Sequence, residues 1–352
     1  MIKGININMK KIFLIDYMIF DETNGGSKFD KDLVEIFKEL NIPIRCFQLK
    51  NINGKIIKLV NLINLLIYLF HQKNTIYFFR HPLYLPPMFQ KLIYRIMKLR
   101  NNKLAGIIAD LEFIRWKGFN YWYKDMQLIK HFDYIIAHND AMVKFLKNKG
   151  INYNKIINLK MTDYLVNNGN CSKRHLSKMI VFSGNLGKSL FLNKLKKEND
   201  INISFSLNLY GNGFSKKDET EILKYKGCFS PDDIIRNMEG SFGLVWDGDE
   251  ITSCVGTLGE YTKINNPHKL SMYIVAGLPV IVWRKAAVAA LVKKYNIGFV
   301  VNDLVEIDDI LNNIDKKTYQ DYLCNVMKLR EKVMVGYHFK SAIKRVIDIL
   351  EE

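Results

Sequence analysis

The chain has 352 residues, 48% of them hydrophobic, which is enough for two globular domains that each bury an apolar core. Its five cysteines form no Cys-X-X-Cys pair, which excludes the common zinc patterns and favours reduced thiols in a cytoplasmic protein. The 52 Lys and Arg residues exceed the 35 Asp and Glu residues by 17, so an anionic partner or substrate is expected.

The N-terminal part of the chain contains no predicted signal peptide or membrane span. Lys10, Lys11 and Asp16 interrupt the first twenty residues, so these lack the apolar core of a signal peptide. The longest apolar stretch, IIKLVNLINLLIYLF at 56–70, is interrupted by Lys58 and two asparagines. It is too short and too polar to cross a bilayer, and we expect a buried amphipathic helix.

A basic region occupies the same part of the chain. No acidic residue lies between Glu39 and Asp110, whereas eleven residues there are basic. The spacing predicts a basic amphipathic helix over 89–103, which suits an anionic lipid leaflet. Its positive side chains are Lys91, Arg95, Lys98 and Lys103. No nucleic-acid-binding motif accompanies the charge, so a membrane surface or lipid phosphate is favoured over nucleic acid, with a solvated face as the remaining alternative.

Short β-branched or aromatic runs alternate with helical segments along the whole chain. The runs cover 11–16, 75–80, 104–110, 134–139, 179–185, 205–213, 241–249, 278–283 and 297–301. This alternation predicts an α/β protein with two Rossmann-like domains, joined by the polar stretch at 167–178. We expect an N-terminal domain over 1–166, a C-terminal domain over 167–330, and a final helix over 331–352 that packs back on the N-terminal domain.

Polar residues and glycines gather where the predicted strands end, which is where parallel sheets bind ligands. They are Gly25, Gly26, Arg80, His81, Asp110, His138, Gly184, Asn185, Tyr210, Gly211 and Asp247. No Gly-X-Gly-X-X-Gly, complete Walker A loop or nucleophile elbow is present, which disfavours dinucleotide redox enzymes, P-loop proteins and hydrolases.

The segment NNPHKLSMYIVAGLPVIVW at 265–283 predicts a loop, a helix, a turn and a buried strand. Pro267 fits the first helical turn, and Gly277 fits a left-handed cap at the helix end. The N–H groups at the helix start, with Lys269 beside His268, suit a phosphate or diphosphate. An ordinary helix cap with a solvated lysine is the alternative.

Three stretches carry a family resemblance: FGLVWDGD at 242–249, the segment 254–283, and AAVAALVKKYNIGFVV at 286–301. They resemble the C-terminal half of bacterial β-galactofuranosyltransferases of O-antigen and capsule biosynthesis and, more distantly, glucosyltransferases that act on serine-rich-repeat adhesins. The resemblance implies the GT-B fold, with two Rossmann-like domains facing a cleft. It also implies a UDP-sugar donor held by the C-terminal domain, no cofactor and no bound metal.

The resemblance assigns donor contacts residue by residue. Lys269 becomes the diphosphate ligand, Lys188 a second basic contact, and Tyr210 the residue at which the uracil lies. Asp247 and Asp249 imitate a metal-binding Asp-X-Asp, but are expected to contact sugar hydroxyls or to form a turn. The remaining donor residues are Gly184, Asn185, Asn265, Asn266, His268 and Ser271.

The resemblance also implies an acceptor site in the N-terminal domain. Relatives have His-Asp where this chain has Ala109-Asp110, which leaves Asp110 as the candidate base; a structural role in a turn is the alternative. Glu22, His81 and Glu112 are the other candidates for the base. The segment 22–28 is expected to be a flexible acceptor loop, and the acceptor residues are Gly25, Gly26, Lys28, Arg80 and His81.

The function expected from these patterns is inverting, metal-independent hexosyl transfer. Galactofuranose would move from UDP-galactofuranose to a lipid-linked saccharide, at the inner face of the cell membrane. Transfer of glucose or N-acetylglucosamine to a glycoprotein is the second hypothesis, and a non-catalytic saccharide- or nucleotide-binding subunit is a third. The sequence leaves open whether the chain forms a homo-oligomer.

Overall fold

The computed structural model describes residues 11–16, 25–47, 55–83, 85–115, 125–166, 172–197 and 203–351. The chain divides into two compact units. Unit 1 comprises residues 1–21, 30–160 and 338–352, and unit 2 comprises residues 22–29 and 161–337. The last helical segment thus belongs to unit 1, and a short piece near the N-terminus belongs to unit 2.

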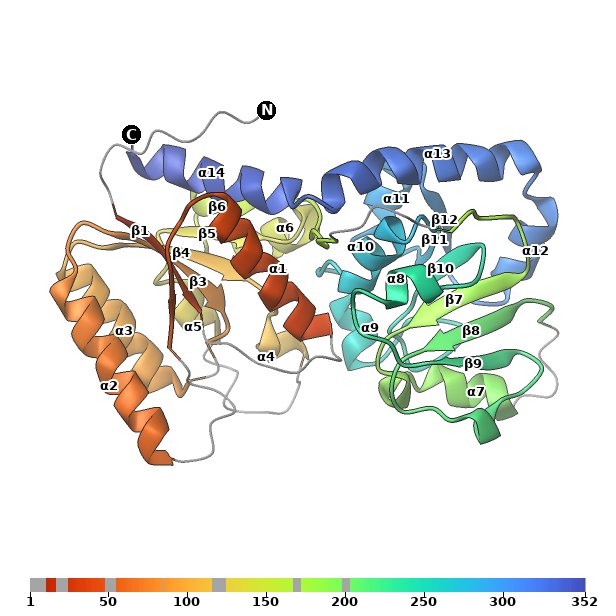
Figure 1. The fold of residues 1–352 in the computed structure, drawn as a ribbon, viewed down its shortest axis with the longest axis horizontal. Coiled ribbons are helices and arrows are strands. Elements are labelled where there is room, and N and C mark those ends of the chain that lie inside the picture. Colours follow the sequence, from red (N-terminus) through yellow and green to blue (C-terminus); the bar gives the residue numbers. More distant parts are fainter. Residues whose placement is uncertain are drawn as a thin grey trace. The chain divides into compact units, whose positions relative to one another are not determined.

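Unit 1 is built on a six-stranded parallel sheet with strand order β2-β1-β3-β4-β5-β6 (Figure 1). The strands are β1 (Ile12–Asp16), β2 (Ile44–Cys46), β3 (Ile76–His81), β4 (Lys103–Ile108), β5 (Tyr134–Ala137) and β6 (Ile156–Asn158). Its helices are α1 (Gly25–Glu39), of which residues 25–29 belong to unit 2, α2 (Lys55–His71), α3 (Pro87–Leu99), α4 (Glu112–Arg115), α5 (Asp125–Ile129), α6 (Asp140–Asn148) and α14 (Tyr337–Glu351), with a 3-10 turn at Tyr153–Lys155. An ion pair between Lys340 and Glu39 joins α14 to α1.

Unit 2 repeats the architecture with strand order β12-β11-β10-β7-β8-β9, again parallel. The strands are β7 (Met179–Ser183), β8 (Ser206–Tyr210), β9 (Leu223–Gly227), β10 (Phe242–Val245), β11 (Val280–Trp283) and β12 (Gly298–Val301). The helices are α7 (Phe191–Lys197), α8 (Ile234–Asn237), α9 (Thr257–Tyr261), α10 (His268–Val275), α11 (Ala289–Tyr295), α12 (Glu306–Asn313) and α13 (Lys316–Val333), with 3-10 turns at Leu186–Lys188 and Lys216–Asp218.

The sequence predicted the central strands of both sheets and missed three others. The missed strands are β2, β6 and β9, and each lies at the edge of its sheet. Edge strands are short and partly exposed, so they lack the continuous apolar pattern that identifies a buried strand. In β9, for example, Lys224 and Lys226 alternate with Leu223 and Tyr225.

Helix boundaries also differ from the prediction in places. Pro267 is the N-cap residue of α10, with extended backbone, rather than part of its first turn. The expected helix over 331–352 is interrupted, because α13 continues to Val333 and α14 begins at Tyr337. Gly277 does end α10 in the left-handed conformation, with φ of 72°, as predicted.

The apolar stretch at 56–70 is buried on one face only, where Leu62, Leu65 and Leu69 lie. The stretch forms α2, as expected, but seven of its large apolar side chains are exposed. The predicted helix over 89–103 is α3, which ends at Leu99, so Lys103 lies on strand β4. The basic side chains of this region are therefore distributed over a helix and a strand.

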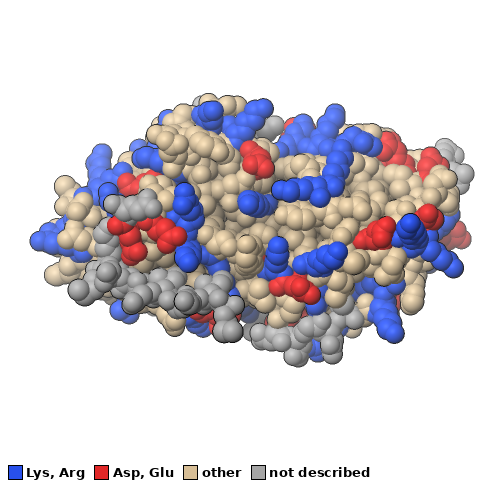
Figure 2. All heavy atoms as spheres, turned by 90° about the horizontal axis from the view of Figure 1, so that it is seen from above, with Lys and Arg blue, Asp and Glu red and all other residues tan. Residues whose placement is uncertain are grey.

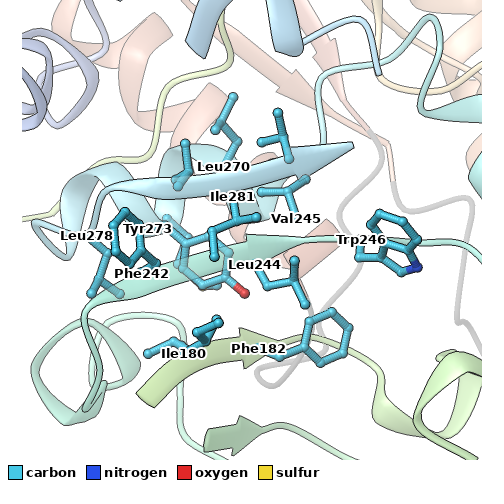
Figure 3. Close-up of a cluster of buried hydrophobic side chains, with 14 of the residues drawn as sticks. Ile180, Phe182, Phe242, Leu244, Val245, Trp246, Leu270, Tyr273, Leu278 and Ile281 are labelled. Atoms are coloured by element: carbon cyan, nitrogen blue, oxygen red, sulfur yellow. The ribbon is translucent and has the colours of Figure 1, made fainter. Parts of the chain in front are cut away.

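The core of unit 2 depends on a close approach of α10 to β10 (Figure 3). A Cβ atom at Gly243 would lie 2.3 Å from the ring of Tyr273, so only glycine lets the ring lie this close to the strand. The buried hydroxyl of Tyr273 accepts a hydrogen bond of 2.8 Å from the backbone N–H of Ser183, the last residue of β7. One side chain thus fixes α10 against two neighbouring strands.

We predict that Tyr273→Phe lowers the free energy of unfolding by about 1–3 kcal/mol, because the N–H of Ser183 loses its acceptor in a buried environment. Chemical denaturation monitored by circular dichroism measures the change. Tyr295→Phe, at a partly exposed tyrosine, is the matched control and should leave stability within about 0.5 kcal/mol. Equal stability of the two variants would show that this hydrogen bond contributes nothing measurable.

Candidate donor and acceptor sites

The donor candidates lie at the topological switch point of unit 2. From β7 the chain first builds β8 and β9 on one side, and then β10, β11 and β12 on the other. The crevice at the carboxyl ends of the two strands flanking such a reversal is where open α/β sheets bind ligands. Gly184 follows β7, Asp247 lies two residues beyond the end of β10, and Lys269 lies in the first turn of α10.

Lys269 reaches both sides of this switch point. Its ammonium donates a hydrogen bond of 2.7 Å to Oδ1 of Asp247 and lies 3.4 Å from the carbonyl oxygen of Trp246. A Cβ atom at Gly184 would lie 3.8 Å from the same nitrogen, so the β7 loop is adjacent. The ammonium also lies 4.6 Å from the centre of the Phe182 ring. A largely buried lysine, held at a helix start beside a glycine turn, has the chemistry of a diphosphate ligand.

The loops after β7 and β8 contact each other through their backbones. A Cβ atom at Gly211 would lie 1.9 Å from the carbonyl oxygen of Gly184, and one at Gly213 would lie 2.4 Å from the backbone nitrogen of Gly187. Gly184, Gly211 and Gly213 all have positive φ. Gly184 and Gly211 were predicted from the sequence as residues at strand ends, whereas Gly213 was not, although the Gly-Asn-Gly spacing indicates a turn there.

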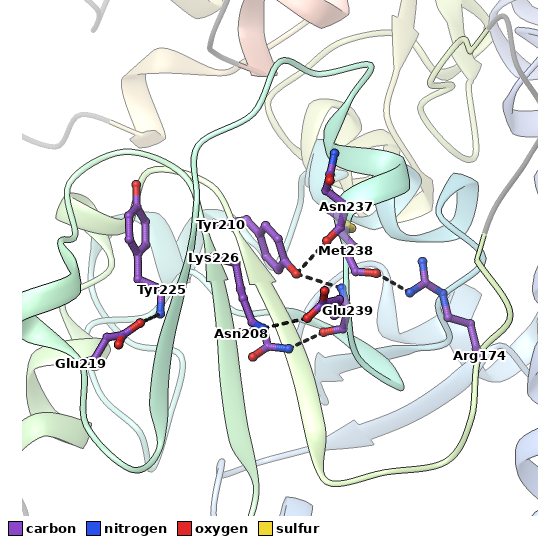
Figure 4. Close-up of polar contacts among 9 residues, drawn as sticks. All are labelled: Arg174, Asn208, Tyr210, Glu219, Tyr225, Lys226, Asn237, Met238 and Glu239. Carbon is purple, nitrogen blue, oxygen red and sulfur yellow. Dashed lines mark hydrogen bonds and ion pairs between the residues drawn. The ribbon is translucent and has the colours of Figure 1, made fainter.

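Tyr210 does not offer its ring to a ligand. The side chain is fully buried, and its hydroxyl donates to the carbonyl oxygen of Asn237 and accepts from the N–H of Glu239 (Figure 4). Burial raises the pKa of the hydroxyl to about 12. The expectation that Tyr210 lies against the uracil is therefore wrong for its side chain, which instead anchors the chain between α8 and β10.

Of the other predicted donor residues, some lie in the exposed turn after β7, and Ser271 is buried. Asn185 caps the turn that contains the exposed Lys188, accepting a hydrogen bond of 3.2 Å from its N–H. Ser271 is fully buried and donates a hydrogen bond of 2.6 Å to the carbonyl oxygen of Thr162, so its role is structural. That buried bond corrects its assignment to the donor.

The loop before α10 contains a buried polar atom without a hydrogen-bond partner in the described structure. Within the described part of the chain, no group donates a hydrogen bond to the buried Oδ1 of Asn265. Asn266 beside it is buried, and the ring of His268 lies between Tyr164, at 4.9 Å, and Phe29, at 6.1 Å between ring centres. These contacts fix the loop that the sequence assigned to the donor.

The Asp-X-Asp imitation is arranged as a turn. The backbone N–H of Asp249 bonds the carbonyl oxygen of Val255 at 2.9 Å, and a Cβ atom at Gly256 would lie 2.0 Å from the carboxylate of Asp249. Asp247 is engaged by Lys269. In the described ranges, no cluster of three or more His, Cys, Asp or Glu side chains suits a metal ion.

The acceptor candidates of unit 1 lie at the carboxyl edge of its sheet. Arg80 and His81 end β3, and both are buried. The guanidinium of Arg80 forms an ion pair with Asp30 of α1, at 2.6 Å between Nε and Oδ1. This buried pair fixes α1 over the end of β3.

The expected flexible loop at 22–28 is instead helical from Gly25, where α1 begins; Gly25 and Gly26 form its start, and Glu22 lies outside the described residues. Lys28 is buried within unit 2, not unit 1. Its ammonium donates to the carbonyl oxygen of Leu165 at 2.6 Å and to Asp232 at 3.0 Å. Lys28 therefore holds its own segment in place, which corrects its assignment to the acceptor.

Asp110 follows β4, and its half-buried carboxylate accepts a hydrogen bond of 2.6 Å from Arg115. Glu112 is buried and lies 3.6 Å from the same guanidinium, so its carboxylate is less accessible than that of Asp110. Next to them His138 bonds the carbonyl oxygen of Ile108 through Nε2, at 2.9 Å. Burial lowers the pKa of His138, against the opposing effect of Asp110, so the ring is neutral at pH 7.

Two family models match the chain in tandem. The glucosyltransferase 3-like N-terminal domain matches residues 13–161, and the glucosyltransferase 3-like C-terminal domain matches residues 180–346, so together they span almost the whole chain. The chain belongs to the glucosyltransferase 3-like family. The prediction of a glycosyltransferase is thereby confirmed, and the two matches coincide with the two parallel sheets.

Characterised relatives of this glycosyltransferase fall into the two classes that the sequence resembled. It is 28% identical over 350 residues to the β-1,6-galactofuranosyltransferase WbbI of Escherichia coli (strain K12), which covers 97% of this chain and 99% of WbbI. It is 26% identical over 260 residues to glucosyltransferase 3 of Streptococcus gordonii, which covers 72% of this chain and 74% of that protein.

Solved structures show the same fold. HepE of Anabaena, in complex with UDP and glucose, matches with a TM-score of 0.60 at 11% identity, over 97% of this chain and 100% of HepE. The lipopolysaccharide outer core galactosyltransferase WaaB matches with a TM-score of 0.57 at 11% identity, over 96% and 99% of the two chains. The predicted fold class, GT-B with two Rossmann-like domains, is confirmed.

We predict that Lys269→Ala weakens UDP binding by about 1.5–3 kcal/mol, or more than tenfold, because a charge-assisted hydrogen bond to the diphosphate is lost. Isothermal titration calorimetry measures the affinity. Lys263→Ala is the matched control, since Lys263 is a half-exposed lysine paired with Glu260 and lies outside the candidate donor site. Unchanged UDP affinity in the Lys269 variant would contradict the assignment.

Proposed function

We propose that this glycosyltransferase transfers galactofuranose from UDP-galactofuranose to a lipid-linked saccharide in the synthesis of a cell-surface polysaccharide, such as an O-antigen or capsule. The observation that carries the proposal is the full-length similarity to a β-1,6-galactofuranosyltransferase, which extends over both units and nearly every residue of each chain. The similarity to glucosyltransferase 3 covers a smaller share of both compared chains.

Transfer of glucose or N-acetylglucosamine from its UDP derivative to a glycoprotein is the second candidate. It is favoured by the family models, both of which are described as glucosyltransferase 3-like and together match both units. The two candidates share the donor nucleotide and differ in the sugar and the acceptor. Contacts to the sugar ring therefore distinguish them, whereas contacts to the diphosphate do not.

In the proposed reaction, Asp110 takes the proton from an acceptor hydroxyl as that oxygen attacks C1 of the donor sugar. The bond between C1 and the β-phosphate oxygen breaks, and UDP leaves with the electron pair. Attack from the side opposite the departing phosphate inverts the configuration at C1. Lys269 and the N–H groups at the start of α10 stabilise the negative charge that develops on the departing diphosphate.

The donor sugar can be identified from UDP release with UDP-galactofuranose, UDP-galactopyranose, UDP-glucose and UDP-N-acetylglucosamine in parallel. We predict that UDP-galactofuranose gives a kcat/KM at least about tenfold above the others, a difference of about 1.4 kcal/mol in transition-state binding. A preference for UDP-glucose would establish the second candidate. Absence of turnover with every donor and saccharide acceptor would favour a non-catalytic subunit.

We also propose that catalysis needs no metal, because Lys269 supplies a positive charge at the place where the diphosphate is expected. We predict that the rate of UDP release stays within about twofold of the untreated rate in roughly 5–10 mM EDTA. This concentration exceeds that of any metal carried over with the protein. A loss of activity that Mn²⁺ or Mg²⁺ restores would assign Asp247 and Asp249 to a metal site after all.

A lipid-linked acceptor implies that the enzyme works at the inner face of the cell membrane, and we propose peripheral association with an anionic lipid surface. No helix in the described ranges is long and apolar enough to cross a membrane. Association would therefore use surface side chains.

A further inference from the structure

Helix α2 exposes a continuous apolar stripe along its length. Ile56, Val60, Ile63, Ile67 and Phe70 follow one another at steps of four and three residues, which places them on one face of the helix. Their exposed fractions range from 45% to 78%. Isolated exposed apolar residues are ordinary, but a contiguous row of this length marks an interaction surface.

The opposite face of α2 already attaches the helix to unit 1. Leu62, Leu65 and Leu69 are buried, with exposed fractions of 6% or less. Helix α2 thus has two apolar faces, only one of which is used within the described structure. The packing of the described residues accounts for the buried face, and none of them covers the exposed stripe.

Helix α3 extends the apolar surface. It packs beside α2 and exposes Met88, Leu92 and Leu99, the last at 83%. The guanidinium of Arg100, just after α3, lies 5.1 Å from the centre of the Phe70 ring at the end of the stripe. We call the exposed residues of the two helices the α2–α3 face; they are Ile56, Ile57, Leu59, Val60, Ile63, Ile67, Phe70, Met88, Leu92 and Leu99.

Neither helix of the α2–α3 face carries an acidic residue. Both helices lie within residues 40–109, where the sequence contains eleven basic residues and no acidic one. Arg95, Lys98 and Lys103 are exposed, and Lys58 and Lys91 are half-buried. Elsewhere the basic excess is mixed with acidic residues, as on the face drawn in Figure 2, where Lys and Arg are interspersed with Asp and Glu.

We propose that the α2–α3 face docks the enzyme on an anionic lipid leaflet, with the α2 stripe buried among the acyl chains nearest the headgroups. An apolar stripe on helices whose only charged residues are basic is the pattern of a helix that lies in a membrane interface. The basic side chains contact the lipid phosphates, and the long lysine and arginine stems extend from the apolar surface to the headgroup level.

A second copy of the chain fits this face less well. In a two-fold interface the same patch meets itself, so basic residues at its border would face basic residues of the partner. Such like-charge contacts oppose association. An anionic leaflet instead presents the complementary charge over the whole face, and no neighbouring protein surface is required.

This proposal rests on the proposed function in one respect: a lipid-linked acceptor is the reason why docking on a membrane is useful to the enzyme. The α2–α3 face belongs to unit 1, whereas the candidate diphosphate ligand Lys269 belongs to unit 2. Binding to lipid can therefore be measured without turnover, and UDP affinity can be measured without lipid. Failure of one measurement leaves the other interpretable.

The test is sedimentation of the full chain with vesicles of phosphatidylcholine alone or with 30–40% phosphatidylglycerol, roughly the anionic content of a bacterial leaflet. We expect binding to the anionic vesicles that weakens as salt rises. The variant Ile56→Gln/Ile63→Gln/Ile67→Gln should reduce the partition coefficient at least about tenfold, because three apolar side chains no longer enter the leaflet. Its fold is checked by circular dichroism and its UDP affinity by calorimetry.

The matched control is Val305→Gln/Met327→Gln/Val335→Gln, which replaces three similarly exposed apolar residues of unit 2 and should bind vesicles like the unaltered chain. The variant Lys91→Gln/Arg95→Gln/Lys98→Gln/Lys103→Gln should also lose at least about tenfold at low salt. If the α2 variant binds vesicles normally while the basic variant does not, the stripe does not insert and the proposal is wrong.

Light scattering tests the other candidate partner of the α2–α3 face, which is a second copy of the chain. If the unaltered chain is dimeric without lipid and the α2 variant is monomeric, the face binds a second copy and the proposal is overturned. A chain whose oligomeric state does not change with the α2 substitutions, together with the loss of vesicle binding, supports the lipid surface.

Discussion

The ring of Tyr273 lies against the bare backbone of Gly243, and the arrangement of unit 2 around Lys269 depends on this contact. Because β10 carries no side chain at that position, α10 approaches the sheet closely enough for the Tyr273 hydroxyl to reach the last N–H of β7. The same approach brings Lys269, one turn earlier on α10, to Asp247 after β10 and to the Gly184 turn after β7. Core packing thus sets the position of the ammonium.

Close backbone contacts at glycines also position the neighbouring loops. Gly211 and Gly213 let the loop after β8 touch the loop after β7 through the backbone, and Gly184 of the β7 loop lies beside Lys269. The start of α10 with its lysine and the glycine turn after β7 meet at a switch point, which is the arrangement on which the proposed diphosphate site rests. Tyr210 and Ser271 are buried, and each donates a hydrogen bond to a backbone carbonyl oxygen, so their roles are structural.

Unit 1 shows a different balance between folding and function. Two of its candidate site residues are held in ion pairs, Arg80 with Asp30 and Asp110 with Arg115. Its apolar side chains are not all covered, since α2 exposes one face while burying the other. A helix that needed only to fold would carry polar residues on the outer face, and the apolar stripe that the described residues leave exposed is the surface for which we propose a lipid partner.

The sequence by itself determined the fold class, the central strands and the loop, helix and strand around Lys269. These depend on local patterns: β-branched runs, a proline and a glycine at the ends of a helix, and periodic apolar residues. The family motifs at 242–301 added the type of enzyme. Only the tertiary structure decided which polar side chains are available to bind a ligand. Tyr210, Ser271 and Lys28 have the side-chain chemistry of ligands, but neighbours distant in sequence satisfy or bury them. Likewise, periodicity showed that α2 is amphipathic but could not show that both of its faces are apolar enough to need a partner. Burial depends on what packs against a residue, and that is a property of the whole fold.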